Sequence, residues 1–240
     1  MAAKLTGWGL WAVAPAGALT SVPWIVIFFV ANPNVNTDQA GFARSATDAP
    51  HAIVGYLYMI GLFCLLFGVL AISAWLQDTQ IRSDPVSPSR AGGIVGRAWN
   101  GSVSSYAMVG MVFGIVAIAM LIGLWTILVF ATATVGDVYL SGHPGAGEVF
   151  KVLSGGHWSA RMVPLFIVWG LAALVAAYCL GSAVRRSGKV SKWVGPAFGF
   201  GFALTMASSP VVSLVGGVLL VVAGVMIARA GAETARRAAA

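Results

Sequence analysis

The sequence predicts an all-α protein, a polytopic bundle of six transmembrane helices with both chain ends in the cytoplasm. Of its 240 residues, 59% are hydrophobic and only 9% are charged, whereas about 25% of an average soluble domain is charged. Apolar runs close to the ~20 residues that cross a bilayer core recur along the chain. A soluble fold could not cover its surface with so few charges, so lipid is the expected solvent.

Six apolar runs follow one another. The first is too long for the apolar core of a typical signal peptide, so we expect it to remain as a helix. The fifth is short and rich in glycine, and only Ser208, Ser209 and Pro210 separate it from the sixth. The predicted spans are residues 7–31, 53–76, 106–135, 162–184, 193–208 and 211–228.

Lysine and arginine set the predicted topology. Eleven of the fourteen cations fall in four segments that alternate with the other connections, and only Arg44, Lys151 and Arg161 lie on the opposite side. The positive-inside rule therefore places both termini in the cytoplasm, as expected for a multi-pass protein of a bacterial inner membrane. The net charge of +7 then reflects topology and contact with anionic lipid, and no nucleic-acid partner is expected.

The whole chain, residues 1–240, is expected to form a single transmembrane domain. Its connections are two outer loops, residues 32–50 and 137–160, and a cytoplasmic linker, residues 77–105. Each outer loop contains a stretch suited to a short helix on the membrane plane, residues 39–46 and 147–153, with a phenylalanine beside a base. Each loop also brings a histidine just before the next span, so a duplicated helix–loop–helix unit is one interpretation and chance is the other.

Histidines and carboxylates gather on the predicted outer side. They are the side chains that suit zinc and related ions. The alternative interpretation is that they are polar residues tolerated at a wet interface, because no tight ligand spacing such as His-x-x-x-His occurs. The candidate metal ligands are His51, His143, His157, Asp48 and Glu148.

Two hypotheses for function follow. No Asp, Glu, Lys or Arg lies in the middle of a span, which argues against a proton-coupled carrier, and no catalytic motif is present. The leading hypothesis is therefore a non-enzymatic protein without a cofactor, either an accessory subunit or a binder or carrier of an apolar molecule. Its partners would be the lipid bilayer and either other membrane subunits or further copies of the chain. The alternative is a redox or metal-dependent membrane protein, with haem or a divalent metal held by His51 and His157.

Two pairs of glycines have the small-xxx-small spacing that lets helices approach closely, Gly110 with Gly114 and Gly195 with Gly199. Packing within one chain is the interpretation we favour over a dimer interface. Prolines such as Pro164 are candidate kinks, and kinks create cavities.

The order of these features carries one resemblance. A first span is followed by an outer loop that ends in Asp48-Ala49-Pro50-His51 and by a Gly- and Leu-rich second span that closes with Ala74-Trp75-Leu76. In this layout the chain resembles uncharacterised six-helix membrane proteins of high-GC, actinobacterial-type bacteria. The resemblance covers most of the chain and implies a fold, but no activity and no functional residues.

Overall fold

The protein is helical in a computed structural model that describes residues 2–25, 39–83, 102–149, 156–206 and 210–239. No β-strand occurs among these residues, so the predicted helical class is confirmed. The elements that the structure describes are α1 Ala2–Ile25, α2 Gln39–Thr47, α3 Ala49–Ser83, α5 Val103–Thr126, the π-helix η2 Ile127–Ala131, α6 Thr132–Leu140, α8 Gly156–Arg186, α9 Val194–Thr205 and α10 Pro210–Ala239.

Four helices are long and apolar enough to cross a membrane: Ala52–Gln77 in α3, Val103–Thr126 in α5, Val163–Arg186 in α8 and Val211–Arg237 in α10. They support a multi-pass membrane protein. In contrast, α9 has only 12 residues and extends about 18 Å, well short of the ~30 Å hydrocarbon core. The predicted fifth span, residues 193–208, is therefore a shorter helix than its apolar run suggests.

Several boundaries differ from those expected from hydropathy. α3 begins at Ala49 and ends at Ser83, so it extends into both the outer loop 32–50 and the linker 77–105. α5, η2 and α6 follow one another without a break to Leu140, beyond the expected end of the third span at residue 135. Polar residues ended the apolar runs in the sequence but do not end the helices, because an α-helix satisfies its own backbone hydrogen bonds in water as well as in lipid.

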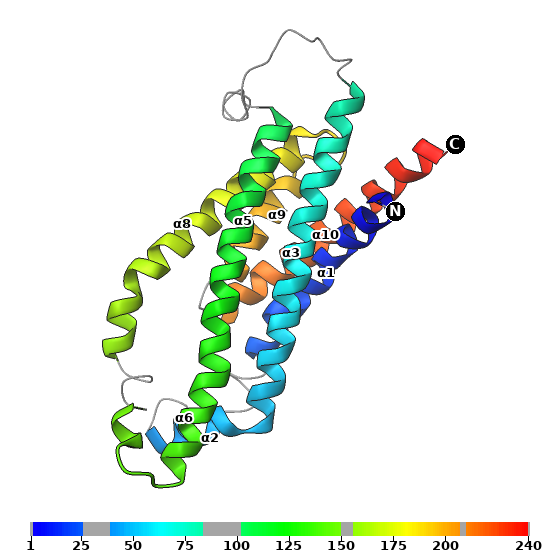
Figure 1. Cartoon of the computed structure of the whole chain (residues 1–240). Helices are drawn as coiled ribbons and strands as arrows, with labels where there is room; N and C mark the ends of the chain where they lie inside the picture. The colour runs from blue at the N-terminus through cyan, green and yellow to red at the C-terminus, as the bar shows by residue number, and fades with distance from the viewer. Residues whose placement is uncertain (1, 26–38, 84–101, 150–155, 207–209, 240) are drawn as a thin grey trace.

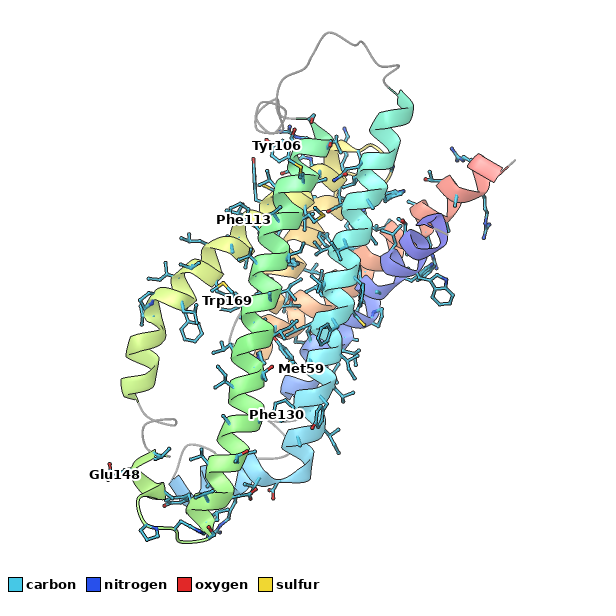
Figure 2. The ribbon with its side chains drawn as sticks, viewed as in Figure 1. Met59, Tyr106, Phe113, Phe130, Glu148 and Trp169 are labelled. Atoms are coloured by element: carbon cyan, nitrogen blue, oxygen red, sulfur yellow. The ribbon has the colours of Figure 1, made fainter. Side chains whose placement is uncertain are left out.

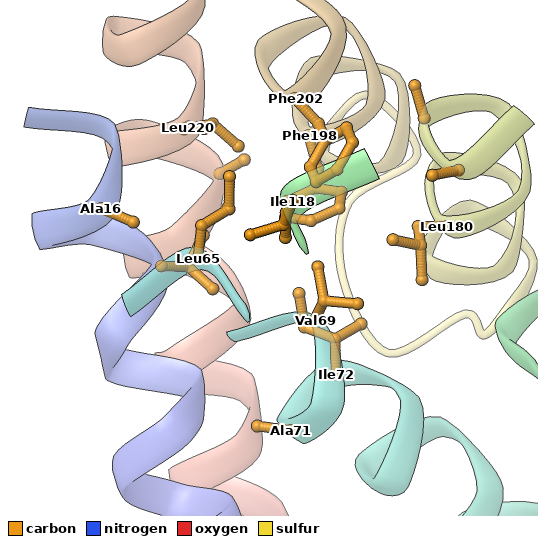
Figure 3. Packing of buried hydrophobic residues seen from close by; sticks show 14 of the residues in the cluster. Ala16, Leu65, Val69, Ala71, Ile72, Ile118, Leu180, Phe198, Phe202 and Leu220 are labelled. Atoms are coloured by element: carbon orange, nitrogen blue, oxygen red, sulfur yellow. The ribbon is translucent and has the colours of Figure 1, made fainter. Parts of the chain in front are cut away.

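Six helices form a closed ring in the order in which they occur along the chain. α1 packs on α3, α3 on α5, α5 on α8, α8 on α9, α9 on α10, and α10 returns to α1. The interior of this ring is filled by apolar side chains rather than by a channel, as Figure 3 shows for Leu65, Val69, Ile118, Phe198 and Leu220. Neighbours in sequence are thus neighbours in space, as short connections favour.

The contact between α1 and α10 closes the ring and is partly polar. The Ser21 hydroxyl donates a hydrogen bond to the carbonyl oxygen of Ser213 at 2.8 Å, and the Ser213 hydroxyl lies 3.5 Å from the carbonyl oxygen of Thr20. All three side chains are buried. Because a buried hydroxyl without a partner is costly, these reciprocal bonds fix α1 against α10 at this level.

The ring closes over only part of the length of the molecule. Gly61 of α3 lies against Leu19 and Thr20 near the end of α1, yet α3 continues for twelve more residues to Ala49, about 18 Å. α5, η2, α6 and α8 also extend past the short α9, and α2 packs on α6 at the far end (Figure 1). We call the part beyond the end of α9 the open half and the other part the closed half.

Both chain ends lie at the closed end of the bundle, together with the end of α3, the start of α5 and the α8–α9 turn (Figure 1). Lys189 in that turn donates from Nζ to the Trp75 carbonyl oxygen at 3.1 Å, and Arg186 stacks on the Tyr106 ring with its Cζ 4.5 Å from the centroid. Figure 2 places Tyr106 and Glu148 at opposite ends of the molecule. The described parts of the cation-rich segments therefore share one end.

Candidate functional site

The candidate site is the region where α8 separates from α5. In the closed half the two helices touch: a Cβ added at Gly110 would lie 2.7 Å from Leu180 Cγ, and one at Gly114 would lie 3.8 Å from Ala176 Cβ. The two helices are antiparallel. If the same register continued, Leu121 would pair with Trp169 and Leu124 with Phe166.

The second of these pairs contains an exposed side chain. Phe166 is 40% exposed, although it lies on the face of α8 that carries Leu180 and Ala176. Around it, every side chain from Val163 to Val168 is exposed, on all faces of the helix. An apolar helix normally buries at least one face against its neighbours, so this half of α8 has no packed neighbour in the described part of the chain.

Two features of the sequence explain why α8 is left without neighbours here. α9, which covers α8 in the closed half through Gly195 and Gly199, ends at Thr205. α8 also slants away from α5 before it bends in its open half (Figure 1), and that half contains Pro164, which cannot donate a backbone hydrogen bond. We call the open half of α8, together with the part of α5 that faces it, the wedge.

The walls of the wedge are apolar. On the α5 side lie the buried Leu121 and the partly buried Leu124. Phe166 and Trp169 lie on the α8 side with their rings edge to face at 6.1 Å. Figure 2 shows Trp169 on α8 where the two helices begin to separate. Trp169 Nε1 is shielded from solvent and has no hydrogen-bond partner among the described residues. None of these four side chains ionises, so the wedge can offer dispersion and apolar burial but no acid–base chemistry.

Three of the five candidate metal ligands have described side chains, and all three are exposed: Asp48, His143 and Glu148. The His143 ring nitrogen Nδ1 lies 2.7 Å from the Ser141 hydroxyl, a contact between near neighbours in one turn. Among the side chains that the structure describes, no three His, Cys, Asp or Glu residues are grouped so that they could hold a metal ion.

The side chains of His51 and His157 lie outside the described residues. Their backbones belong to the first turns of α3 and α8, and α5 packs between these two helices. A shared haem or metal site therefore stays a prediction, which a visible absorption spectrum and metal analysis of the purified protein would test.

The four small-xxx-small glycines all lie against helices of the same chain. Gly110 and Gly114 face α8 and α3, while a Cβ at Gly199 would lie 2.6 Å from the Ala177 carbonyl oxygen and one at Gly195 would overlap the Gly181 carbonyl oxygen. They serve the packing of α5, α8 and α9 within one chain.

The outer loops hold one of the two expected short helices. Residues 39–46 fall within α2, which packs on α6, where a Cβ at Gly136 would lie 3.2 Å from the Ala43 carbonyl oxygen. Of the second stretch, 147–153, the described part is helical to Val149. α2 therefore packs on α6, which continues α5 beyond the predicted third span. The amphipathic pattern of residues 39–46 does not predict this contact.

No protein-family model, curated protein or solved structure matches this chain. The resemblance to uncharacterised six-helix proteins therefore remains a prediction, and the wedge has to be interpreted from its own residues. Sequence reasoning did not single out Leu121, Leu124, Phe166 or Trp169. One signal was available: the fifth apolar run is shorter than the fourth, so part of the fourth helix had to lose its neighbour.

Proposed function

We propose that the protein is a non-enzymatic, six-crossing protein of a bacterial inner membrane that binds a long apolar molecule in the wedge between α5 and α8. Both termini would face the cytoplasm. Besides the four long helices, α1 and α9 would supply the two remaining crossings, with the bilayer thinned around the short α9. The observation that carries the proposal is the exposure of the apolar side chains of Val163–Val168 on every face of α8.

The chemistry of the wedge favours a hydrocarbon chain as the ligand. Its four named side chains are apolar or aromatic, so a hydrocarbon chain would leave no polar group of its own unsatisfied there. The narrow shape of a hydrocarbon chain also suits a space that narrows towards the point where Gly110 and Leu180 meet. The sideways opening would let the ligand enter directly from the hydrocarbon core without crossing the headgroup layer.

A photocrosslinking experiment tests this ligand. Phe166 is replaced by the photoreactive analogue p-benzoylphenylalanine, which has a similar shape, and the full chain is irradiated in membranes and purified in detergent. Phe200 of α9, which is 66% exposed, is the matched control on a face expected to meet bulk lipid. We expect one dominant low-molecular-mass adduct at position 166, identified by mass spectrometry, and a mixture typical of the whole membrane at position 200.

A second variant guards against accidental labelling. Leu124→Trp should fill the wedge opposite Phe166 and reduce the adduct several-fold while the protein still purifies as a folded species. Equal adduct profiles at positions 166 and 200 would contradict the proposal. So would an adduct to a second protein, which would favour an accessory subunit, or to residues 26–38 of the same chain.

A further inference from the structure

The segment from Arg185 to Trp193, at the closed end of the bundle, concentrates positive charge. It contains Arg185, Arg186, Lys189 and Lys192, and no Asp or Glu occurs anywhere in the sequence between Glu148 and Glu233. We propose that the end of α8 and the α8–α9 turn bind the headgroup of an anionic phospholipid. This site lies at the end opposite the wedge and does not depend on the function proposed for it.

Two of the four cations are held in place by aromatic rings of neighbouring helices. Lys189 Nζ lies 4.2 Å from the centroid of the Trp75 ring on α3 and is bound to the Trp75 carbonyl oxygen. Arg186 stacks on Tyr106 of α5, which contacts the Tyr178 ring edge to face at 6.3 Å. The turn itself is tight, and Gly188 in it adopts a left-handed φ of 66°. These contacts with α3 and α5 hold the turn in a defined position.

The other two cations, Arg185 and Lys192, are exposed, as is Arg186. No ion pair joins Arg185 or Lys192 to another described residue. Exposed cations near a membrane surface attract anionic headgroups, and the attraction is strongest where several lie within a Debye length of one another. Because Arg186 and Lys189 add their field to that of Arg185 and Lys192, the phosphate of a lipid is drawn to this turn.

The surface below the cations suits the rest of a phospholipid. On α8, Tyr178 lies two turns from Arg185 on the same face and is 65% exposed, and Leu171 continues that face two turns further. Trp193 at the start of α9 is 48% exposed, an aromatic ring of the kind that sits at headgroup level. A phospholipid with its headgroup at Arg185 and Lys192 would therefore place its acyl chains along an exposed apolar stripe. An acidic protein or a nucleic acid would bind the cations but would not cover this stripe.

The test compares the full chain with two double variants that remove the same charge. Arg185→Gln/Lys192→Gln leaves intact Arg186 and Lys189, the two cations that lie over aromatic rings. Arg236→Gln/Arg237→Gln removes two exposed cations from the end of α10 and is the control. Binding of phosphatidylglycerol and of phosphatidylcholine is measured by native mass spectrometry, after equal melting temperatures in lipid-free detergent have shown that both variants fold.

We expect the original chain to retain phosphatidylglycerol in preference to phosphatidylcholine. The apparent Kd for phosphatidylglycerol should weaken about tenfold in the Arg185/Lys192 variant and less than about twofold in the control. Equal weakening in both variants, no preference between the two lipids, or displacement of the lipid by millimolar inorganic phosphate would overturn the proposal. Retention of an acidic protein in place of lipid would do the same.

Discussion

Glycines position the helices of this protein by lacking a side chain. Gly110 brings the backbone of α5 against Leu180, and Gly181, Gly195 and Gly199 bring α8 and α9 so close that carbonyl oxygens occupy the space of a missing Cβ. Lipid tails are as apolar as leucine, so membrane helices gain little from the hydrophobic effect on associating and depend on this kind of close packing.

Replacing Gly110 by leucine should therefore destabilise the bundle. The new side chain would meet both the backbone nitrogen and the side chain of Leu180, and we expect a loss of about 1–3 kcal/mol, the usual cost of overpacking. The measurement is the melting temperature of the purified protein in detergent.

Gly123→Leu is the matched control, because nothing lies within 4 Å of a Cβ at Gly123. Both substitutions remove a glycine from the interior of α5 and gain helix propensity equally. If Gly110→Leu melts at the same temperature as Gly123→Leu or above it, the close contact with Leu180 does not contribute to stability.

For single residues, the sequence predicts which positions are important for packing but not which residues they contact. The spacing of Gly110 and Gly114 predicts a close approach, yet nothing in it identifies Leu180 as the contact. The cation–π pairs of Arg186 with Tyr106 and Lys189 with Trp75 join residues far apart in sequence and have no local pattern. The proposed ligand-binding residues were missed for a similar reason, since Phe166 and Trp169 look like any other members of an apolar helix.

Among the elements, the lengths of the helices decide where the protein is open. α9 has 12 residues, while its neighbours α8 and α10 have 31 and 30. α9 therefore packs on α8 and α10 only in the closed half, and the open half of α8 does not have α9 as a neighbour. The apolar runs predicted which segments form helices, but hydropathy stops at polar residues and so misjudged where α3 and α5–α6 end.

Lys189 attaches the α8–α9 turn to α3. Lys189→Met keeps the aliphatic stem but removes the ammonium group that binds the Trp75 carbonyl oxygen and lies over its ring. We expect the amides of residues 187–193 to exchange hydrogen several-fold faster in the variant, corresponding to a loss of about 1 kcal/mol.

The matched control is Lys192→Met, which removes an exposed cation from the same turn. Its exchange rates should match those of the unmodified chain. Equal acceleration in both variants would mean that net charge, rather than the contact with Trp75, holds the turn.

For the whole molecule, the proposed orientation can be read from the accessibility of single cysteines. Starting from a chain in which Cys64 and Cys179 are replaced by alanine, cysteines at Gly92 and Ser187 should react only with a reagent supplied from the cytoplasm. Cysteines at Asn36 and Gly145 should react only from outside, because an odd number of crossings separates the two groups.

Two results would overturn the six-crossing proposal. Positions 36 and 92 reacting from the same side would mean that residues 53–76 do not cross the membrane. Positions 145 and 187 reacting from the same side would remove the crossing assigned to α8. Labelling in detergent should reach all four positions and serves as the control for reactivity.

The hydrogen bonds of Ser21 and Ser213 between α1 and α10 have a consequence for how the protein is made. They join two helices whose contact residues, Ser21 and Ser213, are 192 residues apart in the chain, and Gly17 and Gly217 meet at the same contact. Until α10 has been inserted, the Ser21 hydroxyl lacks its acceptor and one side of α1 lacks its neighbour. Co-translational assembly therefore cannot finish step by step: α1 has to wait in the membrane, and a chain that ends before residue 210 should be recognised by the quality-control proteases of the cell as incomplete.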